Sequence, residues 1–316
     1  MKEFKTIDEQ INLLTSRGIG IKDTDKAREI LLKENYYNII NGYKDLFSDD
    51  KDKYLTGTTF EEIYALYDFD RKLRSIFLEY ILKIENTIRS LIAYFFPKYH
   101  GEDNYLNIHS FENFMNVNVT LKTKEEQLKY IEELIANINR KIASSIKTKP
   151  YVKHYMINYG FIPPWIMVKI VSFGELSNFY KLMNQKEREE LAKNFNVKEK
   201  DLVRMVDILA YCRNLCAHNE RIYNCVFPTR LSINDDVIHS EMKIDNINGR
   251  YLLGKNDLFG MMISLKRLLN QSDYERLDSK IYSAFKSLES RLNTISIDKV
   301  IETMNFPYNW HALRNL

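Results

Sequence analysis

The sequence of 316 residues predicts an all-α protein. Several long segments lack Gly and repeat apolar residues at intervals of three and four, which is the spacing of one helix face. One stretch of the second half, residues 227–256, is rich in Asn and Asp and contains Pro and Gly, which predicts a small irregular or hairpin excursion. Hydrophobic residues make up 45% and charged residues 28%, as in ordinary globular proteins.

Residues 1–58 are predicted to form an N-terminal helical segment that precedes the main domain, residues 59–316. Thr6 and Glu9 have the spacing of a capping box and predict a helix that ends before Gly18. A second helix is expected from Thr24 to about Glu34. A tyrosine-rich unit over residues 35–47 and a polar loop follow it.

A long helix is predicted from about Thr59 to Phe96, where Pro97 is expected to end it. Its apolar positions alternate mostly between spacings of three and four: Leu66, Phe69, Leu73, Phe77, Ile81, Ile84, Ile88, Leu91 and Phe95. Its polar face is expected to carry two acid–base pairs at i, i+4 spacing: Asp70 with Arg74, and Glu85 with Arg89.

Residues 100–160 are predicted to be a helical insertion, with one Lys- and Glu-rich helix over residues 122–147. A basic stretch at its end combines cations with Tyr151 and Tyr155: Lys141, Lys147, Lys149, Lys153 and His154. Such a stretch either forms a solvated surface or follows a single RNA strand, and both alternatives stay open.

Further helices are expected after Pro163 and Pro164, and again over residues 257–269 and 274–294. Between them, residues 202–216 form the central helix, whose entry Asn196 or Asp201 is expected to cap. Near the C-terminus, Trp310 is expected to pack back on the body of the protein.

The central helix carries the candidate site. Its apolar residues fall within one arc, and a second arc is polar: Arg204, Asp207, Tyr211, Asn214, His218 and Arg221. Arginine supplies a permanent cation with planar donors for a phosphate, and histidine exchanges protons near neutral pH. Asn214 lies four residues before His218 and could orient its ring. The alternative is an ordinary exposed face.

Cys212, Cys216 and His218 make a poor metal site. Cys216 and His218 point to different faces of the helix, and no second ligand pair occurs in the sequence. The two cysteines are instead expected to pack as small hydrophobic residues. No metal and no cofactor is therefore expected.

The string RNLCAHNERIYN, residues 213–224, resembles the Abi-like abortive-infection family of bacteria, the AbiD/AbiF group. Its R-N-x-x-x-H core resembles the motif of the HEPN superfamily. Other blocks resemble the same family: YDFDRKLR, KIENTIR, a P-x-W followed by S-F-G, and the ending F-P-x-N-W. The resemblance covers about residues 5–312. It implies a HEPN-type helical bundle with extra N-terminal helices.

The resemblance also implies a function, that of a metal-independent endoribonuclease in phage defence. Arg213 and His218 would be catalytic with Asn214 beside them. Other residues that match the motif or the second block would support the site or contact RNA: Tyr211, Asn219, Arg221, Tyr223, Asn224, Glu85 and Arg89. The alternative is a non-cleaving RNA-binding or scaffold protein of a defence or toxin–antitoxin system, for which a regulatory RNA is the expected partner.

The expected partners are RNA and a second copy of the chain. Arg213 and His218 are five residues apart, roughly 140° around a helix, which is a poor arrangement for two acid–base groups on opposite sides of one phosphate. Relatives with the resembled motif commonly pair two copies, so an isologous homodimer is expected. The N-terminus lacks an apolar leader, and no apolar run is long enough to span a bilayer, which favours the cytoplasm.

Overall fold

The computed structural model describes residues 3–49, 53–111 and 123–316, and it confirms the predicted all-α fold. The described α-helices are α1 Ile7–Ser16, α2 Thr24–Glu34, α3 Phe60–His100, α4 Lys124–Ser145, α5 Pro150–Tyr159, α6 Pro164–Met167, α7 Phe173–Leu182, α8 Gln185–Lys193, α9 Glu199–Ala217, α10 Asp236–Glu241, α11 Leu258–Leu268, α12 Gln271–Glu289 and α13 Ile297–Thr303. Two short strands, β1 Asn246–Ile247 and β2 Arg250–Tyr251, pair antiparallel.

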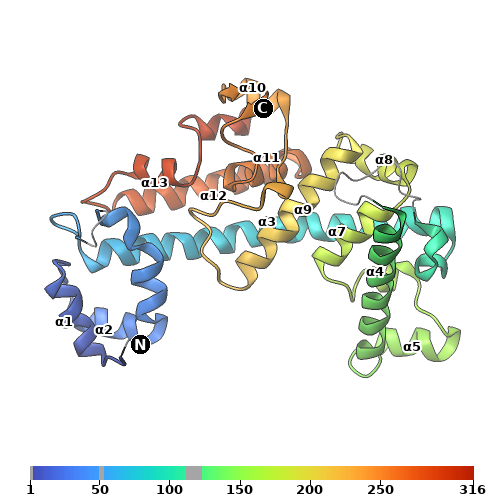
Figure 1. Cartoon of the computed structure of the whole chain (residues 1–316), viewed down its shortest axis with the longest axis horizontal. Helices are drawn as coiled ribbons and strands as arrows, with labels where there is room; N and C mark the ends of the chain where they lie inside the picture. Colours follow the sequence, from blue (N-terminus) through green and yellow to red (C-terminus); the bar gives the residue numbers. More distant parts are fainter. Residues whose placement is uncertain (1–2, 50–52, 112–122) are drawn as a thin grey trace.

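The long helix α3 is the axis of the molecule (Figure 1). The helices α9 and α12 pack along it, and the N-terminal helices and the α4–α5 pair form arms near its two ends. The helix α9 crosses α3 and ends on the side where both arms lie. Within the described ranges, no helix combines the length and hydropathy needed to cross a bilayer.

The helix α3 begins where the sequence predicts, because Thr59 and Glu62 form a reciprocal capping box. It does not end at Pro97, contrary to the prediction. Proline removes one donor, but its fixed φ suits a helix, so the cost of Pro97 is confined to the last turn. The amide of Gly101 closes that turn on the carbonyl of Pro97 at 2.9 Å, and Gly101 ends the helix at φ +80°.

The N-terminal segment contacts α3 at two points, the turn between α1 and α2 and the end of α2. Gly20 and Thr59 form an isolated bridge, and Glu34 accepts hydrogen bonds from Tyr67 at 2.6 Å and from Arg71 at 2.7 Å. These contacts connect it to the main body, and the division at residues 58 and 59 stays a prediction. Between the two helices and α3, a π-helical turn covers Tyr37–Asn41 and a 3-10 helix covers Lys44–Phe47.

The two irregular regions agree with the sequence in outline. The described part of residues 100–160 is mainly helical, with α4 beginning at a Thr123–Glu126 capping box, while residues 112–122 lie outside the described residues. Residues 227–256 contain a 3-10 turn, the short helix α10 and the β1–β2 hairpin. The predicted excursion is therefore confirmed. Trp310 is buried against Phe285 and Phe306, which confirms that the C-terminal tail packs on the body.

Gly260 allows the loop before α11 to lie directly against that helix. A Cβ added there would lie 2.4 Å from the carbonyl oxygen of Lys255, which is backbone and cannot rotate away. We expect Gly260→Ala to lower the free energy of unfolding by about 1–3 kcal/mol, the usual cost of overpacking. Gly174→Ala is the matched control, since a Cβ at that helical glycine meets nothing within 4 Å. Urea denaturation measures both, and equal stability of the two variants would contradict this account.

Candidate functional site

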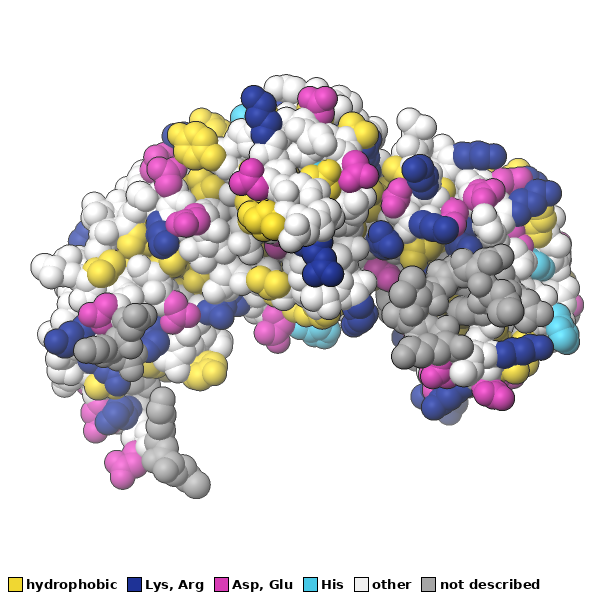
Figure 2. Space-filling view, turned by 45° about the horizontal axis from the view of Figure 1, so that its top comes forward, with side chains coloured by type: hydrophobic (Ala, Val, Ile, Leu, Met, Phe, Trp, Pro, Cys, Tyr) yellow, Lys and Arg dark blue, Asp and Glu magenta, His cyan; other side chains and the backbone are white. Residues whose placement is uncertain are grey.

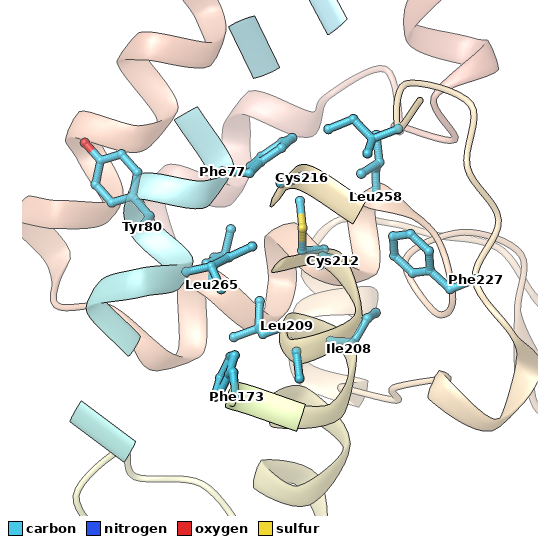
Figure 3. Close-up of a cluster of buried hydrophobic side chains, with 14 of the residues drawn as sticks. Phe77, Tyr80, Phe173, Ile208, Leu209, Cys212, Cys216, Phe227, Leu258 and Leu265 are labelled. Carbon is cyan, nitrogen blue, oxygen red and sulfur yellow. The ribbon is translucent and has the colours of Figure 1, made fainter. Parts of the chain in front are cut away.

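The helix α9 places the candidate residues. Its first residue follows Lys198, and no side chain caps it, so the predicted caps Asn196 and Asp201 are wrong. Asn196 has a left-handed backbone in the preceding turn and Asp201 lies inside the first helical turn. The apolar face of α9 is buried as predicted. Figure 3 shows it packed among side chains from α3, α7, α11 and the following loop: Phe77, Tyr80, Phe173, Phe227, Leu258 and Leu265.

The two cysteines of α9 belong to this core. Cys212 and Cys216 are both free and buried. Burial raises the pKa of the Cys216 thiol to about 12, so the thiol stays protonated at neutral pH. Both side chains therefore act as small hydrophobic residues, as the sequence predicts.

The helix ends at Ala217, so the predicted polar stripe is not one continuous helix face. His218 is the C-terminal cap, and its amide donates to the carbonyl of Asn214 at 3.0 Å. Asn219 has φ +59°, a left-handed conformation that asparagine tolerates and that turns the chain out of the helix. Arg221 therefore lies beyond the helix, because the chain has already turned. His218 and Asn219 are both exposed.

A buried carboxylate holds the chain directly after this turn. Asp70 accepts hydrogen bonds from the amides of Tyr223 at 2.8 Å and Ile222 at 3.2 Å, and from the hydroxyl of Tyr43 at 2.6 Å. It also pairs with Arg74, one turn further along α3. These contacts join three parts of the chain that are distant in sequence. They fix the segment that follows His218.

The prediction that Asp70 and Arg74 lie on a polar face is therefore wrong. Asp70 is fully buried and Arg74 is 4% exposed. Burial raises the pKa of the Asp70 carboxyl, and Arg74, Tyr43 and two backbone amides oppose that effect. A buried charge persists only when it is paired and hydrogen-bonded, and here Arg74 also reaches the carbonyl of Glu220 at 3.4 Å. The i, i+4 spacing of Asp70 and Arg74 does not distinguish a buried pair from an exposed one. The spacing alone therefore could not predict that this pair is buried.

A cleft of about 600 Å³ opens beside His218. The N-terminal segment, α3 and the turn after α9 line it, and most of its charged side chains are cations. Representative lining residues are Lys33, Tyr37, Arg71, Arg74, His218 and Arg221. Among the described residues, no side chain forms a hydrogen bond or ion pair with the His218 ring. The ring is therefore available to a ligand in the cleft.

Arg213 is not among the described residues that line this cleft, and it faces α3. Its Nε is 3.6 Å from Oε2 of Glu85, and its side chain is 31% exposed. Glu85 is buried and also pairs with Arg89, which donates in turn to the carbonyls of Val168 and Val171. The two terminal nitrogens of Arg213 make no hydrogen bond within the described part of the chain. Glu85 therefore orients the guanidinium group and leaves its outer edge free.

The remaining predicted site residues divide into exposed and structural ones. Asn214 is exposed, and its side chain does not hydrogen-bond to the ring of His218. Arg221 is exposed, donates to the carbonyl of Gly42 and lies 3.8 Å from Asp45. These contacts tie the turn after α9 to the N-terminal segment. The side chain of Asn214, within the motif, forms no hydrogen bond with any residue of the described ranges.

The tyrosines of the motif are less accessible. Tyr223 is fully buried and stacks on Tyr43, with ring centroids 5.5 Å apart, so it supports the fold and does not reach the surface. Tyr211 is half-buried and meets Phe227 edge to face, and Asn224 is also half-buried. The sequence does not predict the roles of Asp70 and Tyr43, which hold the segment after His218 in place.

Within residues 3–49, 53–111 and 123–316, no cluster of three His, Cys, Asp or Glu side chains is arranged to hold a metal ion. The available chemistry of the described site is therefore that of one imidazole beside a polar cleft and one guanidinium group beside Glu85. This set can bind a phosphate and exchange protons with it.

The fold and the site thus define an all-α protein with an Arg–His motif at the exposed end of a central helix. The sequence model of the Abi-like protein family matches residues 29–224, which is more than half of the chain. The protein belongs to the Abi-like family. No curated protein and no solved structure matches the sequence.

Proposed function

We propose that this Abi-like protein is a metal-independent endoribonuclease that acts in defence against phage. The observation that carries the proposal is the state of Arg213 and His218. Glu85 orients Arg213 from a buried position, and both the outer guanidinium edge and the His218 ring are unoccupied by any described residue. Structural arginines and histidines usually have their polar atoms satisfied, as Arg89 does.

The proposed chemistry uses the substrate's own nucleophile. A base removes the proton from a ribose 2′-OH, and the oxygen attacks the adjacent phosphorus. The 5′-oxygen leaves with a proton from an acid, which gives a 2′,3′-cyclic phosphate and a 5′-OH end. His218 is the proton-exchanging group, because an imidazole carries one nitrogen that can accept a proton and one that can donate it, and this ring has no partner among the described residues. Arg213 binds the phosphate and stabilises the charge that develops on it.

We further propose that two chains complete one site. In a single chain, His218 lines the cleft beside the N-terminal segment, whereas Arg213 faces Glu85 and is not among the described lining residues. The proposed reaction needs a base at the 2′-OH and an acid at the 5′-oxygen, on opposite sides of the phosphate. A single imidazole can exchange a proton with only one of these oxygens at a time. A twofold axis near the end of α9 would bring two copies of the motif together. The exposed end of α9, on the side where both arms lie, is consistent with such pairing (Figure 1).

Mixing of subunits tests the pairing. Wild-type chains and His218→Ala chains are mixed 1:1 and allowed to exchange, at a concentration well above the dissociation constant. If a site needs both histidines, about a quarter of the dimers stay intact by random pairing, and if it needs one, about three quarters do. Light scattering gives the oligomeric state and RNA cleavage gives the activity. A monomer with full specific activity at every dilution would contradict the two-chain site.

Cleavage of labelled total RNA tests the proposed function itself. We expect cleavage to continue in the presence of a metal chelator, with products that carry 2′,3′-cyclic phosphate and 5′-OH ends. Binding without cleavage would favour the second candidate, a non-cleaving RNA-binding or scaffold protein of a defence or toxin–antitoxin system. The polar cleft beside the exposed His218 supports binding of an RNA strand in both cases.

A further inference from the structure

One long stretch of the chain has no acidic residue. The chain has 43 Asp and Glu in 316 residues, but residues 134–174 contain none. The same stretch contains six Lys and Arg: Arg140, Lys141, Lys147, Lys149, Lys153 and Lys169. It covers the second half of α4, all of α5 and α6, and the start of α7. The net charge of the whole chain is only +3, so its positive charge is concentrated here.

A row of tyrosine side chains on α5 lies next to side chains from α6 and the turn that follows it. Tyr151, Tyr155 and Tyr159 are spaced four apart and share one face of α5. On the neighbouring element, Trp165 donates to the hydroxyl of Tyr155 at 3.5 Å, and Lys169 lies 5.1 Å from the ring centroid of Tyr151. The tyrosine row of α5 therefore lies beside Trp165, with Lys149 and Lys169 over the ring of Tyr151, and we call this the α5–α6 surface.

The aromatic rings of the α5–α6 surface are accessible. Tyr159 is 61% exposed and Trp165 is 40% exposed. His154, Tyr155 and Tyr159 pack against one another, with centroid distances of 5.5 to 6.2 Å. Aromatic residues of this size normally bury most of their area, so an exposed cluster indicates a binding surface.

The lysines of the same surface are also unpaired. Lys149 and Lys169 both lie near the half-buried ring of Tyr151, at 5.9 and 5.1 Å, whereas Lys153 is exposed on the opposite face of α5. Neither Lys149 nor Lys169 forms an ion pair with a described residue, whereas Lys141 is 3.5 Å from Glu175. Two cations without an acidic partner, on the surface that exposes Tyr159 and Trp165, complement a phosphate backbone with unpaired bases.

This surface is connected to the candidate site. Val168, next to Lys169, accepts a hydrogen bond from Arg89, and Arg89 shares Glu85 with Arg213. The arm that carries α5 lies on the same side of α3 as the end of α9 (Figure 1). Figure 2 shows the arms as lobes separated by hollows from the central body. A strand bound at Arg213 could therefore continue towards α5 and α6.

We propose that the α5–α6 surface binds an unpaired RNA strand, with bases stacked on Tyr159 and Trp165 and phosphates held by Lys149 and Lys169. The inference rests on the proposed function, since it names the form of RNA that the Arg213–His218 site receives. Duplex RNA lacks accessible base faces, so the surface selects single-stranded segments.

Equilibrium binding tests the proposal separately from cleavage. The probe is a fluorescein-labelled oligouridylate of about 12 nucleotides, comparable with known single-strand site sizes, and the protein carries His218→Ala. We expect Tyr159→Ala and Trp165→Ala each to weaken binding about tenfold through lost stacking. We expect the double change of Lys149 and Lys169 to Gln to lower the slope of log K against log salt by about 1.4, roughly 0.7 for each lost cation on a single strand.

Matched controls lie elsewhere on the described surface. Tyr308→Ala removes a tyrosine that is 91% exposed, and the double change of Lys243 and Lys299 to Gln removes the same net charge as the double change on the α5–α6 surface. Both controls are expected to bind like the parent protein. Equal loss of affinity in the control double variant, unchanged affinity in the α5–α6 variants, or no binding by the parent would each overturn the proposal. Cleavage of RNA by the wild-type protein in any of these cases would leave the proposed nuclease intact.

Discussion

His218→Ala is expected to lower the rate of RNA cleavage by about 10²–10⁴-fold, the usual contribution of a positioned acid–base group. The variant is expected to keep its stability, because His218 is exposed and its ring has no partner among the described residues. Single-turnover cleavage measures the rate, and thermal unfolding measures the stability. Protection against phage in cells is expected to disappear with the activity.

His109→Ala is the matched control, since it removes another exposed histidine that has no proposed role. We expect it to cleave RNA and protect cells like the wild type. A His218→Ala protein that is folded and fully active would contradict the catalytic role of this residue. Loss of activity in both variants would indicate a general effect of removing surface histidines.

The second large effect is expected at Asp70. The Asp70 carboxylate accepts from four donors: the Tyr43 hydroxyl, the amides of Ile222 and Tyr223, and the Arg74 guanidinium. Asp70→Asn replaces one carboxylate oxygen with an NH2 group, which donates and cannot accept. It also removes the negative charge that pairs with the buried cation of Arg74. Breaking a buried pair in this way costs about 3–5 kcal/mol. That loss is a large part of the stability of an ordinary domain, so the variant is expected to unfold at a much lower denaturant concentration.

Tyr43→Phe separates the role of this network in the site from its role in folding. It removes one hydrogen bond to Asp70 at 2.6 Å and costs about 1 kcal/mol, so the protein stays folded. Because Asp70 holds the segment after His218, cleavage is expected to fall several-fold through a lower kcat. Tyr105→Phe removes an equally buried hydroxyl, which donates to Ile162 at 2.7 Å, and it is the control. Equal activity of the two variants would show that the network does not position His218.

The sequence predicts the helices of this protein well, because capping boxes and apolar spacing are local signals. The capping box at Thr6 and Glu9 is confirmed, and the helix starts predicted near residues 59 and 122 also agree with the structure, which adds boxes at Thr59 and Thr123. The end of α3 was mispredicted because Pro97 occupies the last turn, where the loss of one donor is tolerated. The predicted cap of α9 was wrong for a related reason. No side chain accepts a hydrogen bond from the first amides of α9, because tertiary packing is enough to stabilise the start of this helix.

The sequence predicts those parts of the candidate site whose residues are close together in the chain. The motif residues Arg213 and His218 are visible in the sequence, and so is the relation of Glu85 to Arg89. The partnership of Asp70 with Tyr43, 27 positions earlier, and with the amides of Ile222 and Tyr223, about 150 positions later, carries no local signal. The cleft beside His218 depends on the same long-range contacts. It therefore emerges only in the folded chain.

The most direct test of the central claim uses an RNA in which the ribose at the cleavage position lacks its 2′-OH. The substrate is first mapped with wild-type protein, and one 2′-deoxy nucleotide is then placed immediately 5′ of the cut. If the Arg213–His218 site works by attack of the 2′-OH, cleavage at that bond is abolished and the all-ribose RNA gives a 2′,3′-cyclic phosphate end. Undiminished cleavage of the 2′-deoxy RNA at the same bond would contradict the account.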